Sequence, residues 1–193
     1  MKINFPLLAL AVGAFAIGTT EFSPMGFLPE IANDLSVSIP QAGLLISAYA
    51  VGVMIGAPLM TLWLARFPKK TALILLMAIF TIGNVLATVA PDYMSLMGAR
   101  LITSLNHGAF FGLGSVVAAS AGPKDKQASA VAMMFMGLTI ANIGGVPLAT
   151  WLSQNTSWRM AFAAISILGI MTMLALWKAL PQDHDVVKPN VAK

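Results

Sequence analysis

The stretch AGLLISAYAVGVMIGAPLMTLWL, residues 42–64, carries no charged side chain. Wound as an α-helix, it is about 34 Å long at a rise of roughly 1.5 Å per residue, enough to cross the ~30 Å hydrocarbon core of a bilayer. Similar apolar runs occur at residues 5–28, 71–90, 93–120, 128–152 and 160–180. Short polar connections with proline, glycine or clustered charge separate these runs. The sequence therefore predicts an all-α membrane protein with six transmembrane helices.

The composition supports a membrane protein and excludes several other classes. Of the 193 residues, 58% are hydrophobic and 9% are charged, whereas an average soluble domain is about a quarter charged. Cysteine is absent, which excludes disulfides and thiolate metal sites. The net charge of +4 comes from cations scattered in the connections, so we expect no nucleic-acid partner. The sequence contains no nucleotide-binding or metal-binding motif, and we predict no enzyme activity, metal or cofactor.

The positions of the cations predict how the chain crosses the membrane. With the N-terminus in the cytoplasm, every lysine and arginine except Arg100 and Arg159 lies on the cytoplasmic side, as the positive-inside rule requires. We therefore expect both termini in the cytoplasm, a six-helix bundle over residues 1–180 and a polar, disordered tail over residues 181–193. A cleaved signal peptide is excluded because the first apolar run is too long, contains an acid and precedes five more spans.

An internal repeat relates the two halves of the chain. Residues 56–61 read GAPLMT and residues 145–150 read GVPLAT, so both match G-x-P-L-x-T. A weaker match, GAF, occurs at residues 13–15 and 108–110. The two copies of the longer motif run in opposite directions across the membrane. Spans one to three and four to six are therefore predicted to form a 3+3 inverted repeat, which is typical of secondary transporters.

Two charged residues inside the predicted spans, Glu21 and Arg100, are candidates for function. Intramembrane charges are costly and are usually kept for function. Glu21 lies eight positions before Pro29, and Arg100 lies eight positions after Asp92, so both sit about 12 Å below the outer surface and are expected to meet. One hypothesis is a proton-coupling pair. The alternative is a static ion pair that holds two helices together.

A candidate substrate cavity follows from helical spacing in the fourth span. Arg100, Ser104, His107 and Phe111 fall on one helical face, which we predict to be a cavity wall near the midplane. His107 either relays protons or binds substrate, or as a neutral imidazole it bonds a neighbouring helix; the sequence leaves this open. Asn84, Asn106 and Asn142 are predicted to be buried amides that either contact a ligand or, as we favour, bond across helices.

Several motifs resemble those of the major facilitator superfamily, in its arabinose-efflux-like drug and sugar proton-antiporter branch. They are GTTEF at 18–22 with GFLP at 26–29, Arg100 with HGAFFG at 107–112, GLTIANIGGVP at 137–147, and WR at 158–159 with Phe162. The resemblance implies that Glu21 and Arg100 take part in proton coupling. It also assigns an antiporter and gating motif to the fifth span, at Gly137, Gly144, Gly145 and Pro147.

The loop between the second and third spans departs from the family pattern. Family members usually carry G-x-L-A-D-R-x-G-R-K there. In this chain Thr61 replaces the first glycine, Ala65 the aspartate and Pro68 the second glycine. The cations Arg66, Lys69 and Lys70 remain, which the resemblance assigns to the cytoplasmic loop motif. Family members have twelve spans in two six-helix halves, so the chain resembles the N-terminal half and residues 181–193 resemble the start of the linker.

The sequence thus predicts a transporter or half-transporter of the bacterial inner membrane. It would exchange protons for a small drug-like or sugar-like solute by alternating access. Its expected partners are the lipid bilayer, protons, the solute and a second six-helix half, either another copy of the chain or a C-terminal half. The alternative is a truncated six-helix fragment that does not transport. A channel is disfavoured because no filter-like sequence is present.

Overall fold

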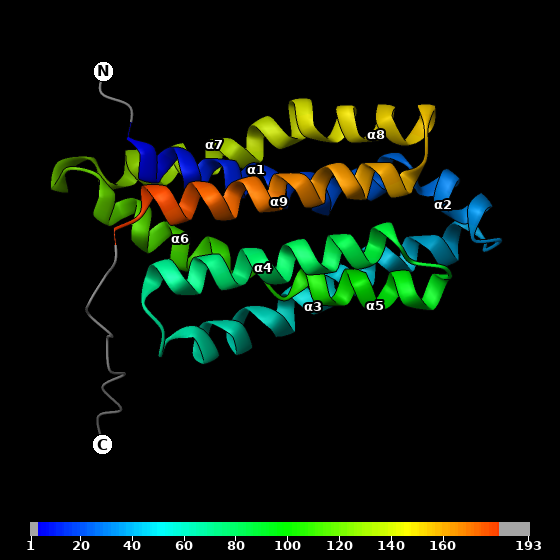
Figure 1. The fold of residues 1–193 in the computed structure, drawn as a ribbon, viewed down its shortest axis with the longest axis horizontal. Coiled ribbons are helices and arrows are strands. Elements are labelled where there is room, and N and C mark those ends of the chain that lie inside the picture. The colour runs from blue at the N-terminus through cyan, green and yellow to red at the C-terminus, as the bar shows by residue number, and fades with distance from the viewer. Residues whose placement is uncertain (1–3, 182–193) are drawn as a thin grey trace.

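The computed structural model describes residues 4–181 and shows a bundle of long helices (Figure 1). Within that range six segments are long and apolar enough to cross a membrane. The first three are α1 (Phe5–Gly26), α3 (Ile39–Leu64) and α4 (Lys69–Thr88). The fourth joins α5 (Tyr93–Ser104) to α6 (His107–Ala121), and the sixth is α9 (Trp158–Ala179). These segments confirm the predicted six-helix fold.

The fifth span and the connection between the first and second spans are more irregular than the sequence predicted. The fifth span combines a 3-10 turn, η1 (Lys124–Lys126), with α7 (Gln127–Ile140), a π-helical turn, η2 (Ala141–Gly145), and α8 (Val146–Asn155). The π turn lies just before Pro147, whose missing N–H breaks the ordinary α-helical pattern. The backbone N–H of Val146 instead donates to the carbonyl of Ala141, five residues back. The first connection forms a short helix, α2 (Leu28–Asp34), where a loop was expected.

The packing of the spans follows the predicted inverted repeat. The third span α4 packs along the sixth span α9, and these two correspond to each other in the repeat. The first span α1 packs against α7 and α8 of the fifth, as α5 and α6 of the fourth pack against α3, the second. The first span also contacts the sixth, as the fourth contacts the third. These pairs are thus matched by their counterparts under a two-fold relation between the halves, whereas the packing of α8 on α9 has no equally extensive counterpart between α3 and α4.

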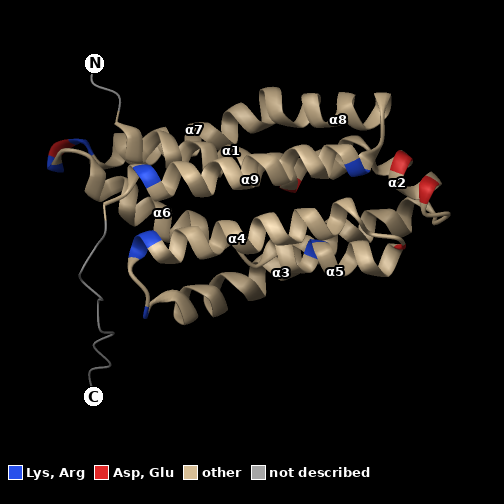
Figure 2. Ribbon diagram, viewed as in Figure 1, with Lys and Arg blue, Asp and Glu red and all other residues tan. Residues whose placement is uncertain are grey.

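Most cations lie at one end of the bundle and most acids at the other (Figure 2). We call the end where α1 begins and α9 ends the basic end; its cations are Arg66, Lys69, Lys70, Lys124, Lys126 and Lys178. The other end, the acidic end, carries Glu30, Asp34 and Asp92. This separation is the geometry that the positive-inside rule was expected to produce. The predicted tail, residues 181–193, lies outside the described residues except for Pro181.

Side chains at the acidic end fix the start of the helices that begin there. The Asp92 carboxylate accepts a hydrogen bond from the backbone N–H of Ser95 at 2.9 Å, which caps α5. Ser38 caps α3 in the same way through Gln41 N–H at 3.2 Å. Such caps satisfy backbone donors that the helix itself leaves unpaired.

An ion pair at the acidic end joins α2 to α9. The Asp34 carboxylate accepts hydrogen bonds from the Arg159 guanidinium and from the indole N–H of Trp158, the latter at 3.0 Å. The second terminal nitrogen of Arg159 donates to the carbonyl of Ala90 at 2.8 Å. The hydrogen bond from Arg159 holds the pKa of Asp34 below its usual value. This contact ties α2 to the ends of two spans.

Replacing Asp34 by Asn is expected to lower stability slightly, and only where the carboxylate is ionised. Because its folded-state pKa is lowered, Asp34 contributes stability above about pH 4 and loses it as the pH falls through the folded-state pKa. The pair is partly exposed to solvent, so we expect less than about 1 kcal/mol. Thermal unfolding of both proteins from pH 7 down to pH 3 checks this: the difference should shrink with falling pH. A constant difference would show that the charge is not responsible.

Candidate functional site

Arg100 is buried in the bundle without a carboxylate partner. Its side chain is 1% exposed, and one terminal nitrogen, Nη1, donates to the carbonyl oxygen of Thr20 at 2.9 Å. Its guanidinium lies 4.2 Å from the centre of the Tyr49 ring, a cation–π contact. Within residues 4–181, its Nε and Nη2 have no hydrogen-bond partner. A buried cation with open donors is costly to maintain, which is typical of a functional group.

Glu21 faces His107 and through it the hydroxyl of Tyr49. Its Oε2 lies 3.8 Å from Nε2 of His107, and the other ring nitrogen, Nδ1, lies 3.2 Å from the Tyr49 hydroxyl. When the hydroxyl donates to Nδ1, the neutral imidazole carries its proton on Nε2, directed toward the carboxylate. Glu21 and His107 remain partly accessible, with 27% and 15% of their side chains exposed.

The expectation that Glu21 and Arg100 meet directly is corrected by these contacts. No Glu21 oxygen lies within 4 Å of an Arg100 nitrogen; among described residues the ion pairs are His107–Glu21 and Arg159–Asp34. Tyr49 connects the two groups, with its ring against Arg100 and its hydroxyl against His107. Equal depth was insufficient because the rotation of each helix decides which neighbour a side chain faces. We call Glu21, Tyr49, Arg100 and His107 the buried network.

Two fully buried asparagines lie next to residues of the network. The side-chain oxygen of Asn84 in α4 accepts a hydrogen bond from the Thr20 hydroxyl at 2.6 Å, and its amide donates to Phe80 of its own helix. Asn106 lies in the break between α5 and α6, and its side-chain nitrogen and oxygen have no hydrogen-bond partner among the described residues. Asn84 therefore holds the α1 backbone next to Arg100, while Asn106 leaves unpaired polar atoms one residue before His107.

The predicted cavity face of the fourth span is only partly formed. The helix breaks between Ser104 and His107, so the two do not continue one face. Ser104 is buried against Gly52 of α3, and its hydroxyl donates to the carbonyl of Leu101. Phe111 does lie beside the network, with its ring centre 5.1 Å from that of His107. Ser104 is thus a packing residue, whereas Phe111 flanks the site.

Asn142 is not buried as predicted. It is exposed on the fifth span, and its amide donates to the carbonyl of Leu138, one turn earlier in the same span. Asn142 lies in the π turn η2, which the sequence did not predict. Asn142 therefore stands apart from the buried network.

The glycines of the predicted gating motif bring the fifth span close to α1. A Cβ atom on Gly137 would lie 2.0 Å from the backbone oxygen of Ala11, and one on Gly145 would lie 2.2 Å from the Thr19 hydroxyl. Only glycine permits such close backbone approach. Gly144, in contrast, faces open space. Two of the motif's three glycines thus hold the fifth span against the helix that carries Glu21.

The cations of the predicted loop motif lie at the basic end, away from the buried network. The Arg66 guanidinium stacks 5.2 Å from the Trp63 ring centre and 5.4 Å from that of Phe67. Lys70 donates from its ammonium group to the carbonyl of Leu180 at 2.6 Å, which joins the start of α4 to the end of α9. Lys69 lines two cavities at this end.

Sequence reasoning missed Tyr49 and Thr20 as parts of the site, whereas Asn84 is buried and bonds across helices as predicted. Tyr49 is one of only two tyrosines, and it lies in the middle of an otherwise apolar run. A lone tyrosine there must find a partner for its hydroxyl, which was the available signal.

Over residues 4–181, the structure contains no group of three or more His, Cys, Asp or Glu side chains placed to hold a metal ion.

Six spans in an inverted repeat around a buried charged network define the half-bundle architecture of a secondary transporter. The sequence profile of the Major Facilitator Superfamily matches residues 10–193. The chain belongs to this family of membrane transporters, as its motifs predicted.

Individual relatives agree with the family assignment. The chain is 67% identical over 193 residues to the inner membrane transport protein YdhP of Escherichia coli K12, covering 100% of this chain and 50% of YdhP. It is 41% identical over 185 residues to the putative transporter AraJ of the same strain, covering 96% of this chain and 47% of AraJ. The chain therefore spans about half the length of the curated relatives it matches.

A solved structure confirms the fold independently of close sequence similarity. The crystal structure of a bacterial homolog to the human lysosomal transporter Spinster, inward-facing and unoccupied, matches with a TM-score of 0.80. The sequence identity is 18%, and the match covers 94% of this chain and 44% of that one. The shared fold confirms the six-helix fold of this chain.

Proposed function

We propose that the chain is half of a proton-coupled exporter of the bacterial inner membrane, with its termini in the cytoplasm. The observation that carries the proposal is the buried network. It places a partly accessible carboxyl, an imidazole and a phenol in series, ending at a buried guanidinium. Groups that gain and lose protons are rare within membrane spans and mark proton pathways.

The network provides a physical means of coupling. When the Glu21 carboxyl is ionised, it attracts the imidazole of His107 and the guanidinium of Arg100 across a medium of low dielectric. When Glu21 takes up a proton, that attraction is lost, and the open donors of Arg100 can turn to a solute or another acceptor. Proton uptake and solute binding thus act on the same groups, so each biases the state that the other favours.

A second six-helix half is required to complete the site. The exposed side of α3 and of the fifth span carries large apolar residues, among them Val51, Met54, Ile143 and Leu148. The relatives are about twice as long as this chain. We propose that the missing cavity wall comes from a C-terminal half or, failing that, from a second copy of the chain.

The solute is proposed to be small and drug-like or sugar-like. Two relatives suggest this range by their names. One is the chloramphenicol resistance protein of Streptomyces lividans, 33% identical over 176 residues, and the other is the probable sugar efflux transporter of Pasteurella multocida, 31% identical over 176 residues. The aromatic pair Phe111 and Phe135, stacked at 5.2 Å beside His107, offers an apolar surface for such a solute.

Uptake into everted vesicles with an acidic interior tests the proposal. Vesicles would contain the chain alone, or the chain together with the half of E. coli YdhP that it does not match, and would be screened over labelled drugs and sugars. In the vesicles that contain both halves, we expect uptake that requires the proton gradient. Uptake by the chain alone would identify the second half as another copy.

The alternative is a six-helix fragment that inserts but does not transport. The observation that favours it is that the chain spans half the length of its relatives. Its distinguishing result is correct insertion without gradient-dependent uptake in either kind of vesicle, across the whole screen.

Tyr49→Phe is expected to slow gradient-driven uptake about three- to tenfold. The substitution removes the hydroxyl that bonds His107 but keeps the ring over Arg100, and one lost hydrogen bond has an effect of this size. Tyr49→Leu, which also removes the ring, should lose more. Tyr93→Phe is the matched control, since this tyrosine donates to Gln41 away from the network. Equal uptake in the Tyr49 and Tyr93 phenylalanine variants would remove Tyr49 from the pathway.

A further inference from the structure

We propose that the basic end binds one anionic phospholipid, with its headgroup at Lys69 and Lys70 and an acyl chain in an adjoining apolar cavity. The inference is independent of the proposed transport function. Both cavities lie at the basic end, and none of their lining residues belongs to the buried network. The inference rests on two cavities that share Lys69.

The headgroup cavity is lined by two lysines and is less apolar than the adjoining cavity. It has a volume of about 520 Å³ and lies where α1 begins, α4 begins and α6 and α9 end. Lys69, Lys70, Asn4 and Ser120 contribute its polar groups, and its described lining includes no acidic residue. The Lys70 ammonium has three N–H donors, and the structure shows a bond from this group to the Leu180 carbonyl. The cavity thus offers two cations to a phosphate group.

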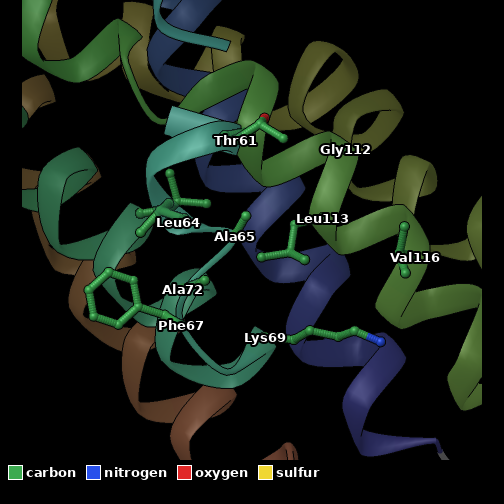
Figure 3. A pocket seen from close by; sticks show the side chains of 11 residues that line it. Thr61, Leu64, Ala65, Phe67, Lys69, Ala72, Gly112, Leu113 and Val116 are labelled. Atoms are coloured by element: carbon green, nitrogen blue, oxygen red, sulfur yellow. The ribbon is translucent and has the colours of Figure 1, made fainter. Parts of the chain in front are cut away.

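The acyl-chain cavity is apolar and lies between α3, α4 and α6 (Figure 3). It has a volume of about 400 Å³, within the range of small-molecule sites. Leu64, Phe67, Leu113 and Val116 contribute apolar walls. In Figure 3, the Lys69 side chain reaches from the start of α4 across one edge of this cavity.

The local sequence explains why the gap exists. Pro58 lies inside α3, and the end of α3 that leads into α4 lies apart from the rest of the bundle (Figure 1). The residues that face the gap from the three helices include Ala65, Ala72, Ala109 and Gly112, which are too small to close it. A Cβ atom on Gly112 would meet nothing within 4 Å.

A phospholipid fits both cavities at once, because its headgroup carries the anion and its acyl chain is apolar. A free anion fits only the headgroup cavity. Apolar cavities do not hold water well, and at the end of membrane spans the nearest apolar filler is a lipid chain. The Lys69 side chain suits this boundary because its methylene stem can lie along apolar surface while its ammonium reaches a headgroup. Basic pockets between transmembrane helices recognise anionic headgroups in this way.

Lipid binding to the detergent-purified chain can be counted by native mass spectrometry. The probes are phosphatidylglycerol and phosphatidylcholine of the same chain length. We expect one phosphatidylglycerol retained in preference to phosphatidylcholine. The double variant Lys69→Gln/Lys70→Gln should weaken that binding about 10- to 30-fold, as expected for two cations near a headgroup. The control, Lys124→Gln/Lys126→Gln, removes the same charge from the same end but outside both cavities.

A second pair of variants tests the acyl chain separately. Gly112→Leu fills the apolar cavity and should weaken phosphatidylglycerol binding severalfold, while Gly98→Leu, also in open space, should not. Glycerol phosphate, which has the anionic group but no chain, should not compete. Equal loss in both lysine pairs, or no effect of Gly112→Leu, would overturn the proposal. Competition by glycerol phosphate would show a site for free anions, and binding that appears only after residues 182–193 are removed would show that the tail occupies it.

Discussion

Glu21→Gln is expected to reduce proton-driven uptake into everted vesicles to the level of vesicles without the protein. Glutamine keeps the size of the side chain and can still accept a hydrogen bond, but it cannot exchange a proton. Exchange of labelled for unlabelled solute, which needs no net proton movement, should persist. The two assays together separate a lost proton step from a lost binding site.

Asp125→Asn is the control for this prediction. Asp125 is an exposed acid in η1 at the basic end, so neutralising it removes a negative charge without touching the buried network. It should leave both assays unchanged. Proton-driven uptake that survives in Glu21→Gln at the normal rate would assign Glu21 to the static ion-pair alternative instead.

Gly137→Ala is expected to destabilise the bundle by about 2–3 kcal/mol. The new methyl group would overlap the backbone oxygen of Ala11 at 2.0 Å, and a backbone atom cannot rotate away as a side chain can. The first and fifth spans must then separate, which costs at least as much as overpacking a core. Thermal unfolding in detergent measures the effect.

Gly144→Ala is the matched control, seven residues further along the same span. Its methyl group would meet nothing within 4 Å, and alanine favours helical structure over glycine by up to about 1 kcal/mol. It should therefore leave stability unchanged or raise it. Equal destabilisation by both substitutions would show that the close contact with α1 is not what Gly137 provides.

Most of the fold could be predicted because the length and apolarity of a membrane span can be read directly from the sequence. Length and apolarity located all six spans, and the proline motifs at residues 56–61 and 145–150 revealed the repeat. The break at Asn106 and the π turn at Ala141–Gly145 could not be predicted. The apolar pattern of a sequence does not show where backbone hydrogen bonds change partner, because these changes depend on packing between helices.

The candidate site could be predicted in part. Glu21, Arg100 and His107 stood out because ionisable residues are rare within spans, and the structure brings Glu21 to His107. The partner of Arg100 was missed. It is the ring of Tyr49, and a cation–π contact between two spans depends on how each helix is rotated. Asn142 is exposed in the described half-bundle, although a buried amide was expected.

The buried network also explains why an arginine without a carboxylate partner can be retained inside the bundle. The Thr20 carbonyl and the Tyr49 ring partly compensate its charge, while its open donors remain for another acceptor. A fully satisfied ion pair would be a better structural device, because it would leave no buried polar atom unpaired. The incomplete pairing favours a group that changes partner during a transport cycle.

Proton release on solute binding tests most directly whether Glu21 is the coupling group. The chain, complemented by the unmatched half of E. coli YdhP, would be held in lightly buffered detergent with a pH-sensitive dye while a solute identified in the vesicle screen is added. We expect binding to release protons, and we expect Glu21→Gln to bind the solute without release. Release of the same size from Glu21→Gln, or solute binding that releases no protons at any pH in the unaltered chain, would contradict it.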